Sequence, residues 1–296
     1  MRIFYGLLCS SLCRCSKIVN AQSTHSIDNN VMSDNNQTEN KPLNDKYLDT
    51  PLESTVPERI SLDYIGKVSS PYKEKFAIPR QPGLVSAAKG SITLIGDANT
   101  PDIVRGLEAF SHLWVIFVFH ATQAQGWKSL VRPPRLGGNK KIGALATRST
   151  YRPNPIGMSL VKLDHIEIIS TAEKKNVTLN ISGHDLLDGT PIIDLKPYIP
   201  YSDANIDAVA SYAQFAPKKE ISVTFSHLAT LALQKLDKTY PELKIFITQI
   251  LEQDPRPAYK QKKHDDKVYG MSLYNLNIQW QLTSLSSITV INIEKT

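Results

Sequence analysis

The chain has 296 residues, of which 41% are hydrophobic and 21% are charged, and its formal net charge is +6. These proportions are typical of a globular protein with one large or two modest domains. The three cysteines lie within residues 1–15, so the rest of the chain has neither a disulfide framework nor a thiolate metal site. The seven histidines have no metal-ligand spacing, and no segment approaches the roughly 20 apolar residues of a membrane span. We therefore expect no metal and no membrane among the partners.

Residues 1–59 have the composition of an extension rather than of a folded domain. Residues 1–21 vaguely resemble a secretory or targeting peptide, but Ser10 and Ser11 interrupt their apolar stretch. Residues 22–59 are rich in Ser, Asn, Asp, Thr and Pro, which is typical of disordered segments. We interpret residues 1–59 as a disordered or targeting-like extension, and favour an unstructured segment over a working signal.

Residues 60–204 alternate strand-like runs with turns rich in proline and glycine. The continuous apolar run at residues 113–119, rich in β-branched and aromatic side chains, predicts a strand buried on both faces. Thr100 and Pro101 form an N-cap and a first helical position, which predicts a short helix to about residue 108. Other strands are predicted at residues 62–68, 90–94, 142–147, 159–170 and 176–182. Many strands with one short helix favour a mainly β fold, a barrel or a sandwich, over βαβ units.

Residues 205–296 are predicted to form a small α+β module. Leucines near helical spacing predict a helix over residues 226–238. Residues 239–242 have the pattern of a capping box that opens a second helix, and the prolines at residues 254–257 end it. Two or three strands follow, between residues 268 and 293.

The segment of residues 143–157 is the most informative in the chain. Arg148 and Arg152 precede two prolines and a glycine, which restrict the backbone around two guanidinium groups. Such a stiff turn is suited to forked hydrogen bonds with an anion or a polar ligand. Residues 121–163 contain no Asp or Glu and many basic residues, which favours a nucleic-acid or phosphate surface. A solvated basic face with ordinary turns remains an equal alternative.

Familiar nucleotide-binding motifs do not occur in the sequence. No G-x-G-x-x-G follows a predicted strand, and there is no Walker loop. From its residues alone, the chain is a basic β-barrel protein with a rigid arginine turn.

Across residues 62–281 the chain resembles the TrmO family, also called YaeB or TsaA-like. The resemblance is carried by blocks in the family order, which are IGKVSSP at 65–71, FAIPRQP at 76–82, LEAFSHLW at 107–114, FVFH at 117–120, VRPPRLG at 131–137, ATRSTYRPNPIG at 146–157, LLDGTPIIDLKPY at 186–198 and DPRPAY at 254–259. The departures are small: Leu145 stands where the family usually has Phe, and Thr150 where it usually has Pro. Ala121 takes a position that is often polar, which leaves only backbone atoms for one cofactor contact.

The resemblance implies a fold and a reaction. Members of this family are single-sheet β-barrels that bind S-adenosylmethionine and methylate N6 of threonylcarbamoyladenosine next to the anticodon of threonine tRNA. The resemblance also implies a cytoplasmic homodimer. The cofactor-binding residues that it implies are Pro79, Arg80, Gln81, His120, Ala121, Arg148, Met158, Asp185, Leu186, Leu187 and Asp188.

The substrate needs cations for its carboxylate and for nearby phosphates. The expected tRNA-binding residues are Arg132, Arg135, Arg152, Arg256 and Tyr259. Because the reacting N–H is ureido-like and weakly basic, a proton acceptor is expected, and His120, Asp188 and Tyr151 are the open candidates. A lone histidine such as His120 is also compatible with a satisfied core residue. Lys196 is expected to pair with Asp194 in a structural turn.

Two other classes of function remain open on the sequence. The first is a non-catalytic β-barrel that binds RNA through Arg132, Arg135, Arg148 and Arg152. The second, suggested only by the N-terminus, is an exported ligand-binding barrel.

Overall fold

The computed structural model describes residues 59–171, 175–218, 221–257, 260–261 and 263–296. The chain divides into two units, residues 1–58 and 59–296, and all described residues belong to the second. The predicted N-terminal extension up to residue 58 therefore lies outside the described residues, as does Tyr259. Within the described ranges, no helix has the length and apolar character needed to cross a membrane.

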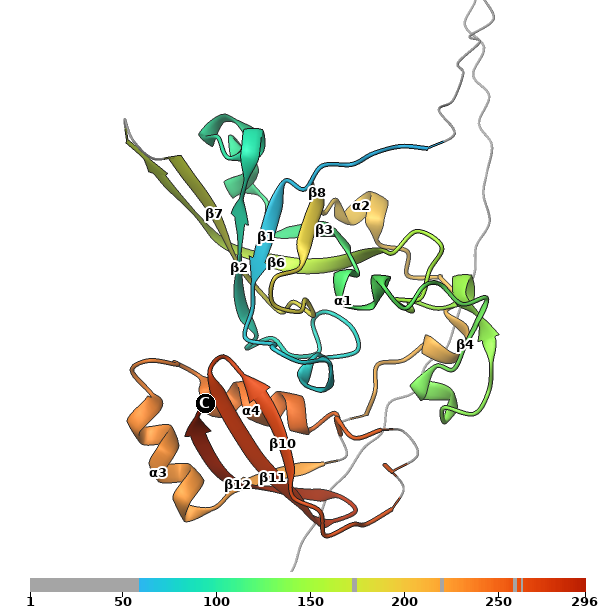
Figure 1. The fold of residues 1–296 in the computed structure, drawn as a ribbon, viewed down its shortest axis with the longest axis vertical. Helices are drawn as coiled ribbons and strands as arrows, with labels where there is room; N and C mark the ends of the chain where they lie inside the picture. The colour runs from blue at the N-terminus through green and yellow to red at the C-terminus, as the bar shows by residue number, and fades with distance from the viewer. Residues whose placement is uncertain (1–58, 172–174, 219–220, 258–259, 262) are drawn as a thin grey trace, which may run out of the picture. The chain divides into compact units, whose positions relative to one another are not determined.

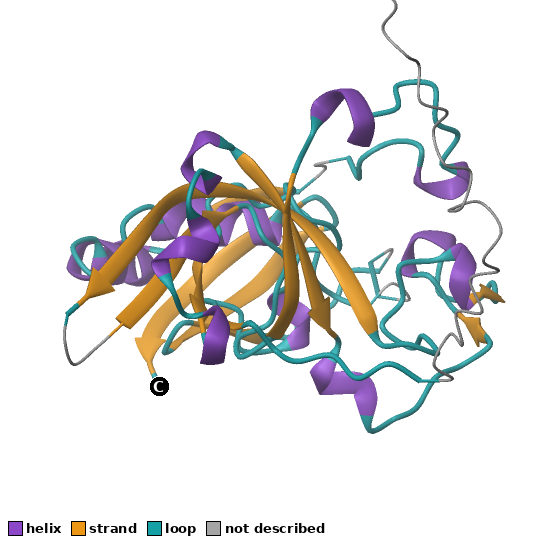
Figure 2. Ribbon diagram, turned by 90° about the horizontal axis from the view of Figure 1, so that it is seen from above, coloured by secondary structure: helices purple, strands orange, loops and turns teal. Residues whose placement is uncertain are grey.

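A closed barrel of antiparallel strands forms the N-terminal part of the described chain (Figures 1 and 2). Around the barrel the strand order is β1-β2-β7-β6-β3-β8, and every neighbouring pair is antiparallel. The bounds are β1 Gly66–Ser69, β2 Lys89–Leu94, β3 His112–Val118, β6 Ile156–Ser170, β7 Lys175–Ser182 and β8 Pro191–Pro197. The predicted β-barrel is thus confirmed.

The barrel interior is filled by every second side chain of its strands. In β3, Leu113, Val115 and Phe117 are buried, whereas Trp114 and Ile116 are partly exposed. The prediction that this strand is buried on both faces is therefore wrong, because the second face of a closed single-sheet barrel is its outer surface. Gly157 of β6 lies opposite Phe117, and any Cβ there would collide with the aromatic ring.

Short elements lie between β3 and β6 and after β8. Those between β3 and β6 are α1 His120–Gln123, β4 Leu130–Val131 and β5 Ile142–Gly143, and α2 Pro200–Asp203 follows β8. The helix predicted at residues 100–108 is wrong: two 3-10 turns, Pro101–Val104 and Leu107–Ala109, lie on either side of Gly106, whose φ is 86°. A left-handed residue at that position ends the helical path.

Two further sequence predictions need correction. The strand predicted at residues 142–147 ends at Gly143, and a 3-10 turn at Ala144–Ala146 follows it. Asp194 and Lys196 do pair, with Oδ2 and Nζ 2.8 Å apart, but they lie in β8 rather than in a turn. The sequence did not predict β8, because Asp194 and Lys196 interrupt its apolar run and a proline stands at each of its ends.

The C-terminal part is a four-stranded sheet with two helices. The sheet order is β10-β11-β12-β9, and β9 is parallel to β12. The bounds are β9 Ser222–Phe225, α3 His227–Leu236, α4 Leu243–Leu251, β10 Tyr269–Leu273, β11 Leu276–Ser284 and β12 Ser287–Lys295. Ser226 caps α3 by accepting a hydrogen bond from the backbone N–H of Ala229 at 3.0 Å. The predicted capping box of α4 is wrong, because Glu242 has a left-handed φ of 65° and makes no side-chain cap.

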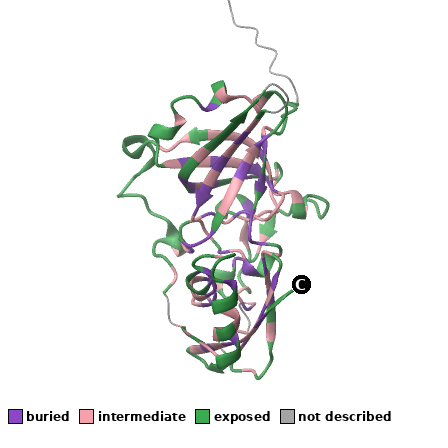
Figure 3. Cartoon of the chain, turned by 90° about the vertical axis from the view of Figure 1, so that its left-hand side faces the viewer, coloured by how far each residue is buried: buried purple, intermediate pink, exposed green. Residues whose placement is uncertain are grey.

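The segment between β1 and β2 packs into the C-terminal core rather than into the barrel. Tyr72, Val85 and Ala88 are fully buried in one cluster with side chains of α4 and of the C-terminal sheet. Tyr72 forms a bridge to Leu273, and the backbone N–H of Ala87 donates to the Gln249 side chain at 3.0 Å. Buried stretches are seen in both parts of the chain (Figure 3). These contacts fix the loop that carries residues 79–81.

Candidate functional site

A cavity of about 970 Å³ opens where β3 ends and β6 begins. This volume lies in the range of small-molecule sites, about 300–1,000 Å³. Segments far apart in the sequence line it, including residues 73–81, 116–122, 150–152, 156–158 and 253–257. Its lining includes Phe117 and Phe119, so the wall combines aromatic surface with charged groups.

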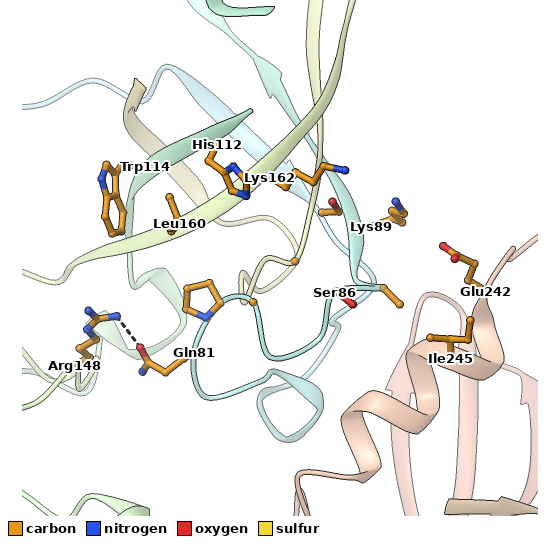
Figure 4. A pocket seen from close by; sticks show the side chains of 15 residues that line it. Gln81, Ser86, Lys89, His112, Trp114, Arg148, Leu160, Lys162, Glu242 and Ile245 are labelled. Carbon is orange, nitrogen blue, oxygen red and sulfur yellow. Dashed lines mark hydrogen bonds between the residues drawn. The ribbon is translucent and has the colours of Figure 1, made fainter. Parts of the chain in front are cut away.

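Arg148 and Gln81 join two of these segments. Nη1 of Arg148 donates a hydrogen bond of 2.7 Å to Oε1 of Gln81, as Figure 4 shows. Nε2 of Gln81 in turn donates to the backbone oxygen of Arg80 at 2.5 Å. The amide therefore uses both of its ends and holds the guanidinium at the cavity wall.

Arg152 braces the turn that carries Arg148. Its Nη1 donates to the backbone oxygen of Thr147 at 2.7 Å and to that of Ala144 at 3.3 Å. Thr147 also donates from Oγ1 to the backbone oxygen of Ala144 at 2.8 Å. The stiffness that the prolines and glycine predicted is thus reinforced by the second arginine, which also lines the cavity.

Asp185 is a buried carboxylate in the cavity wall. Oγ of Ser159, an inward-facing residue of β6, donates a hydrogen bond of 2.6 Å to Oδ1 of Asp185. Burial raises the pKa of Asp185 to about 6, and the hydrogen bond from Ser159 and the nearby charge of Arg148 partly oppose that rise. The carboxyl group therefore changes its charge close to neutral pH.

Asp188 has a different environment from Asp185. Its Oδ1 accepts a hydrogen bond of 2.8 Å from the backbone N–H of Ser70, and its Oδ2 lies 2.7 Å from Nζ of Lys73. Burial acts to raise the pKa of Asp188, but the hydrogen bond and ion pair with Lys73 outweigh it and keep that pKa below its usual value. The carboxylate is ionised and occupied at neutral pH.

His120 and Tyr151 also belong to the cavity wall. His120 is the first residue of α1, which follows β3 after Phe119. The Tyr151 hydroxyl donates to Oε1 of Gln125 at 2.8 Å, and Nζ of Lys128 lies 4.3 Å from the centre of its ring. Both side chains line the cavity, so both remain within reach of a bound ligand.

Comparison with known proteins decides the family. The model of the tRNA-methyltransferase O N-terminal domain matches residues 67–204, and the model of the TrmO C-terminal domain matches residues 218–296. The chain belongs to the TrmO family.

Relatives and solved structures agree with this assignment. The chain is 52% identical over 221 residues to the tRNA (adenine(37)-N6)-methyltransferase of Escherichia coli K12, covering 75% of this chain and 92% of that protein. It is 42% identical over 237 residues to a putative S-adenosylmethionine-dependent methyltransferase, RcsF, of Pseudomonas aeruginosa, covering 79% of this chain and 97% of that protein. A crystal structure of TrmO from Pseudomonas aeruginosa superposes with a TM-score of 0.65 at 35% identity, covering 80% of this chain and 98% of that one.

Most of the cofactor residues that the TrmO resemblance implies line this one cavity. They are Pro79, Arg80, Gln81, His120, Ala121, Arg148, Met158, Asp185 and Leu187. Leu186 and Asp188 are not among the lining residues. Leu186 is instead fully buried in the barrel core, whereas its two neighbours, Asp185 and Leu187, line the cavity. Asp188 is held by Ser70 and Lys73, which also weakens its claim as a proton acceptor.

The arginines expected to contact RNA do not all lie at the cavity. Arg152 lines the cavity, whereas Arg132 and Arg135 do not. Arg135 donates from Nη2 to the backbone oxygen of Phe215 at 2.6 Å, so the loop of residues 131–137 is tied to the segment before β9.

Arg256, an expected RNA contact, is buried and engaged in contacts within its own loop. Its side chain is fully buried, and Nε and Nη2 bind the two carboxylate oxygens of Asp254 at 2.8 and 2.7 Å. Its remaining donors bind the backbone oxygens of Lys263 and Gln261. Arg256 therefore ties together the loop after α4, a role that the exposed-looking motif DPRP did not suggest.

Sequence reasoning missed Ser159. The signal was a polar residue at an inward-facing position of a strand, between Gly157 and Val161, which also face inward. Such a residue needs a hydrogen-bond partner inside the barrel, and Asp185 is that partner. Within the described ranges, no three or more His, Cys, Asp or Glu side chains gather in a way that could hold a metal ion.

Proposed function

We propose that this chain is an S-adenosylmethionine-dependent tRNA methyltransferase that methylates N6 of threonylcarbamoyladenosine at position 37, next to the anticodon. The observation that carries the proposal is the cavity that most of the predicted cofactor residues line together. The names of the relatives support the reaction class and the position of the target adenine. The threonylcarbamoyl group and threonine tRNA as the substrate rest on the family resemblance.

The cavity residues fit the chemistry of the cofactor. Gln81 and the backbone around it offer donors and acceptors for an adenine edge, and Arg148 offers a guanidinium for a carboxylate. The aromatic rings of Phe117 and Phe119 meet edge to face, with centroids 5.0 Å apart, and give the cavity an apolar wall. When bound, S-adenosylmethionine supplies an electrophilic methyl group on a sulfonium. The protein's task is therefore mainly to position N6 in line with that methyl group.

The structure favours Asp185 as the proton acceptor over the earlier candidate Asp188. Asp185 lines the cavity, and one of its oxygens is oriented by Ser159. A pKa of about 6 leaves its carboxylate ionised but still basic at neutral pH. When N6 is methylated, the Asp185 carboxylate would take up the proton that N6 loses. His120 and Tyr151 stay as alternatives for this step.

The same reasoning places the cations of the substrate site. Arg152 in the cavity is suited to the threonylcarbamoyl carboxylate, and Arg132 and Arg135 outside it are suited to phosphates. We also propose a cytoplasmic homodimer in which the cofactor cavity lies near the partner chain, and the partner's Arg132 or Arg135 contacts the phosphates of the tRNA bound there. Sedimentation that finds a fully active monomer at nanomolar concentration would contradict the dimer.

The test of the proposed function is nucleoside analysis of tRNA from cells that lack this protein. We expect the methylated threonylcarbamoyladenosine to disappear and its unmethylated form to accumulate. The alternative, a non-catalytic RNA-binding barrel, predicts unchanged nucleosides. Calorimetric titration with S-adenosylmethionine separates the two as well, because only the methyltransferase should bind it.

A further inference from the structure

A second hollow of about 660 Å³ adjoins the Gln81–Arg148 hydrogen bond. Gln81 and Arg148 line both this hollow and the cofactor cavity. Its other walls come from the outer faces of β3 and β6 and from residues 242 and 245 of the α4 region (Figure 4). Apart from Gln81 and Arg148, the residues that line this hollow are not among those expected from the sequence to contact the cofactor or the RNA.

The hollow carries an excess of positive charge. Nζ of Lys89 and Nζ of Lys162 each lie 3.5 Å from the carboxylate of Asp164, with exposed side-chain fractions of 54% and 59%. The ammonium groups of Lys89 and Lys162 therefore share the single carboxylate of Asp164. Arg148 adds a third cation, and Glu242 is the one acidic residue among those that line the hollow. Exposed cations in excess at a concave surface attract a polyanion.

An anchored aromatic residue stands beside these cations. Nε1 of the half-exposed Trp114 donates a hydrogen bond of 3.0 Å to Oδ2 of Asp203. The ring of Tyr198 meets Trp114 edge to face, with centroids 5.9 Å apart at 61°. A fixed indole next to a cationic groove is the combination that holds single-stranded nucleic acid, by stacking on bases and by pairing with phosphates.

We infer that this hollow binds the RNA strand beside the target adenosine, with Lys89 and Lys162 at a phosphate and Trp114 stacked on a neighbouring base. The inference rests on the proposed function and specifies the substrate side of that site. The Gln81–Arg148 pair is then the wall shared by cofactor and RNA, which places one nucleotide in each hollow. Lys89, Lys162 and Arg148 carry three positive charges against the two carboxylates of Asp164 and Glu242, which leaves a net charge of +1 for an RNA phosphate.

Binding of a fluorescent anticodon stem-loop RNA carrying threonylcarbamoyladenosine to the full-length chain tests this inference. For Lys89→Gln and Lys162→Gln, we expect weaker binding and a slope of log affinity against log salt that is shallower by about 0.7 for each lost phosphate contact on a single strand. For Trp114→Ala, we expect binding weaker by about 5- to 150-fold, with Trp114→Phe restoring most of it because a ring is kept. S-adenosylmethionine affinity, measured by calorimetry, should stay at the wild-type value in all four variants.

Lys235→Gln is the matched control, because Lys235 is an exposed lysine on α3 that lines neither hollow. If the wild-type chain methylates this RNA and the lysine and tryptophan variants bind it as tightly as the wild type does, the inference is overturned. The proposed function then still stands. Variants that instead dissociate an oligomer in sedimentation would also overturn it, since the hollow would then be an interface between copies. A wild-type chain that neither binds nor methylates the RNA would remove the proposed function itself, and the inference with it.

Discussion

Ser159 and Asp185 form a hydrogen bond of 2.6 Å between the inner face of β6 and the loop before β8. The pair couples the barrel interior to the cavity wall, because Ser159 is fully buried while Asp185 lines the cavity. Burial is the main cause of the raised pKa of Asp185, and the charge of Arg148 opposes it by favouring the ionised form. Burial also raises the pKa of Tyr72, and the charge of Asp185 adds to that rise. The neighbouring His184 is buried with its pKa lowered to about 4, so it is neutral at physiological pH.

Asp185→Asn should separate activity from stability. Burial raises the native pKa of Asp185 from its ordinary value of 3.8 to about 6, so the native state holds its proton more tightly than the unfolded state. Stability therefore falls as the pH rises from about 4 to 6, and the ionised carboxylate destabilises the fold at pH 7 by up to roughly 3 kcal/mol at 1.36 kcal/mol per pKa unit. We expect the Asn variant to unfold at higher denaturant concentration, yet to lose methyl transfer by about 100-fold or more. A variant that keeps its activity would remove Asp185 from the reaction.

Ser159→Ala should move the pH dependence of the reaction. The hydrogen bond from Ser159 lowers the pKa of Asp185, so its loss should raise that pKa above about 6. The acidic limb of kcat/KM should shift to higher pH by the same amount, and the 13C resonance of the Asp185 carboxyl should titrate in parallel in the free protein. Ser222→Ala, which removes a serine from the C-terminal sheet, is the control and should leave both curves in place. An unchanged acidic limb in Ser159→Ala would assign that limb to another group.

Gly157→Ala should destabilise the barrel. The new methyl group would occupy the space of the Phe117 ring on the paired strand. Overpacking of this kind costs about 1–3 kcal/mol. Chemical denaturation measures the loss, and Phe117→Leu in the same chain should recover part of it by vacating that space. Equal losses in the single and double variants would mean that the collision is not the cause.

Gln81→Ala and Arg135→Ala should each weaken a different ligand, the first S-adenosylmethionine and the second tRNA. The Gln81 amide holds Arg148 in the cofactor cavity, so its removal should weaken S-adenosylmethionine binding about tenfold or more, since a hydrogen bond to a charged group contributes about 1.5–3 kcal/mol. Arg135 lies outside that cavity, so its removal should leave cofactor affinity unchanged and make the salt dependence of tRNA binding shallower by about one phosphate contact. Calorimetry and binding at several salt concentrations measure both. The reverse pattern would mean that the two ligands have been assigned to the wrong residues.

Much of the barrel could be predicted from local pattern, because strands with alternating or continuous apolar residues have a strong signal. The long strand β6 and the apolar strand β3 were both found in this way. The closure of the barrel depends on β8, whose Asp194 and Lys196 hide the strand pattern. β8 is held as a strand by its pairing with β1 and β3, which its own sequence does not predict.

The site was less predictable than the fold. Motifs named the segments that meet in the cavity, but burial decides what each side chain does there. Asp185 and Asp188 are three positions apart and equal in sequence terms, yet one is buried against Ser159 and the other pairs with Lys73. Arg256 has the look of a surface arginine, and its burial against Asp254 depends on a loop that no local pattern specifies.

Methyl transfer by the purified full-length chain tests the central claim most directly. The substrates are S-adenosylmethionine and two anticodon stem-loop RNAs, one with and one without the threonylcarbamoyl group on the adenosine next to the anticodon. Mass spectrometry of the digested RNA should find one added methyl group on the modified adenosine, and little or none on the unmodified RNA, because the basic site offers cations for the carboxylate of that group. Equal methylation of both RNAs, or no methylation of either, would contradict this account.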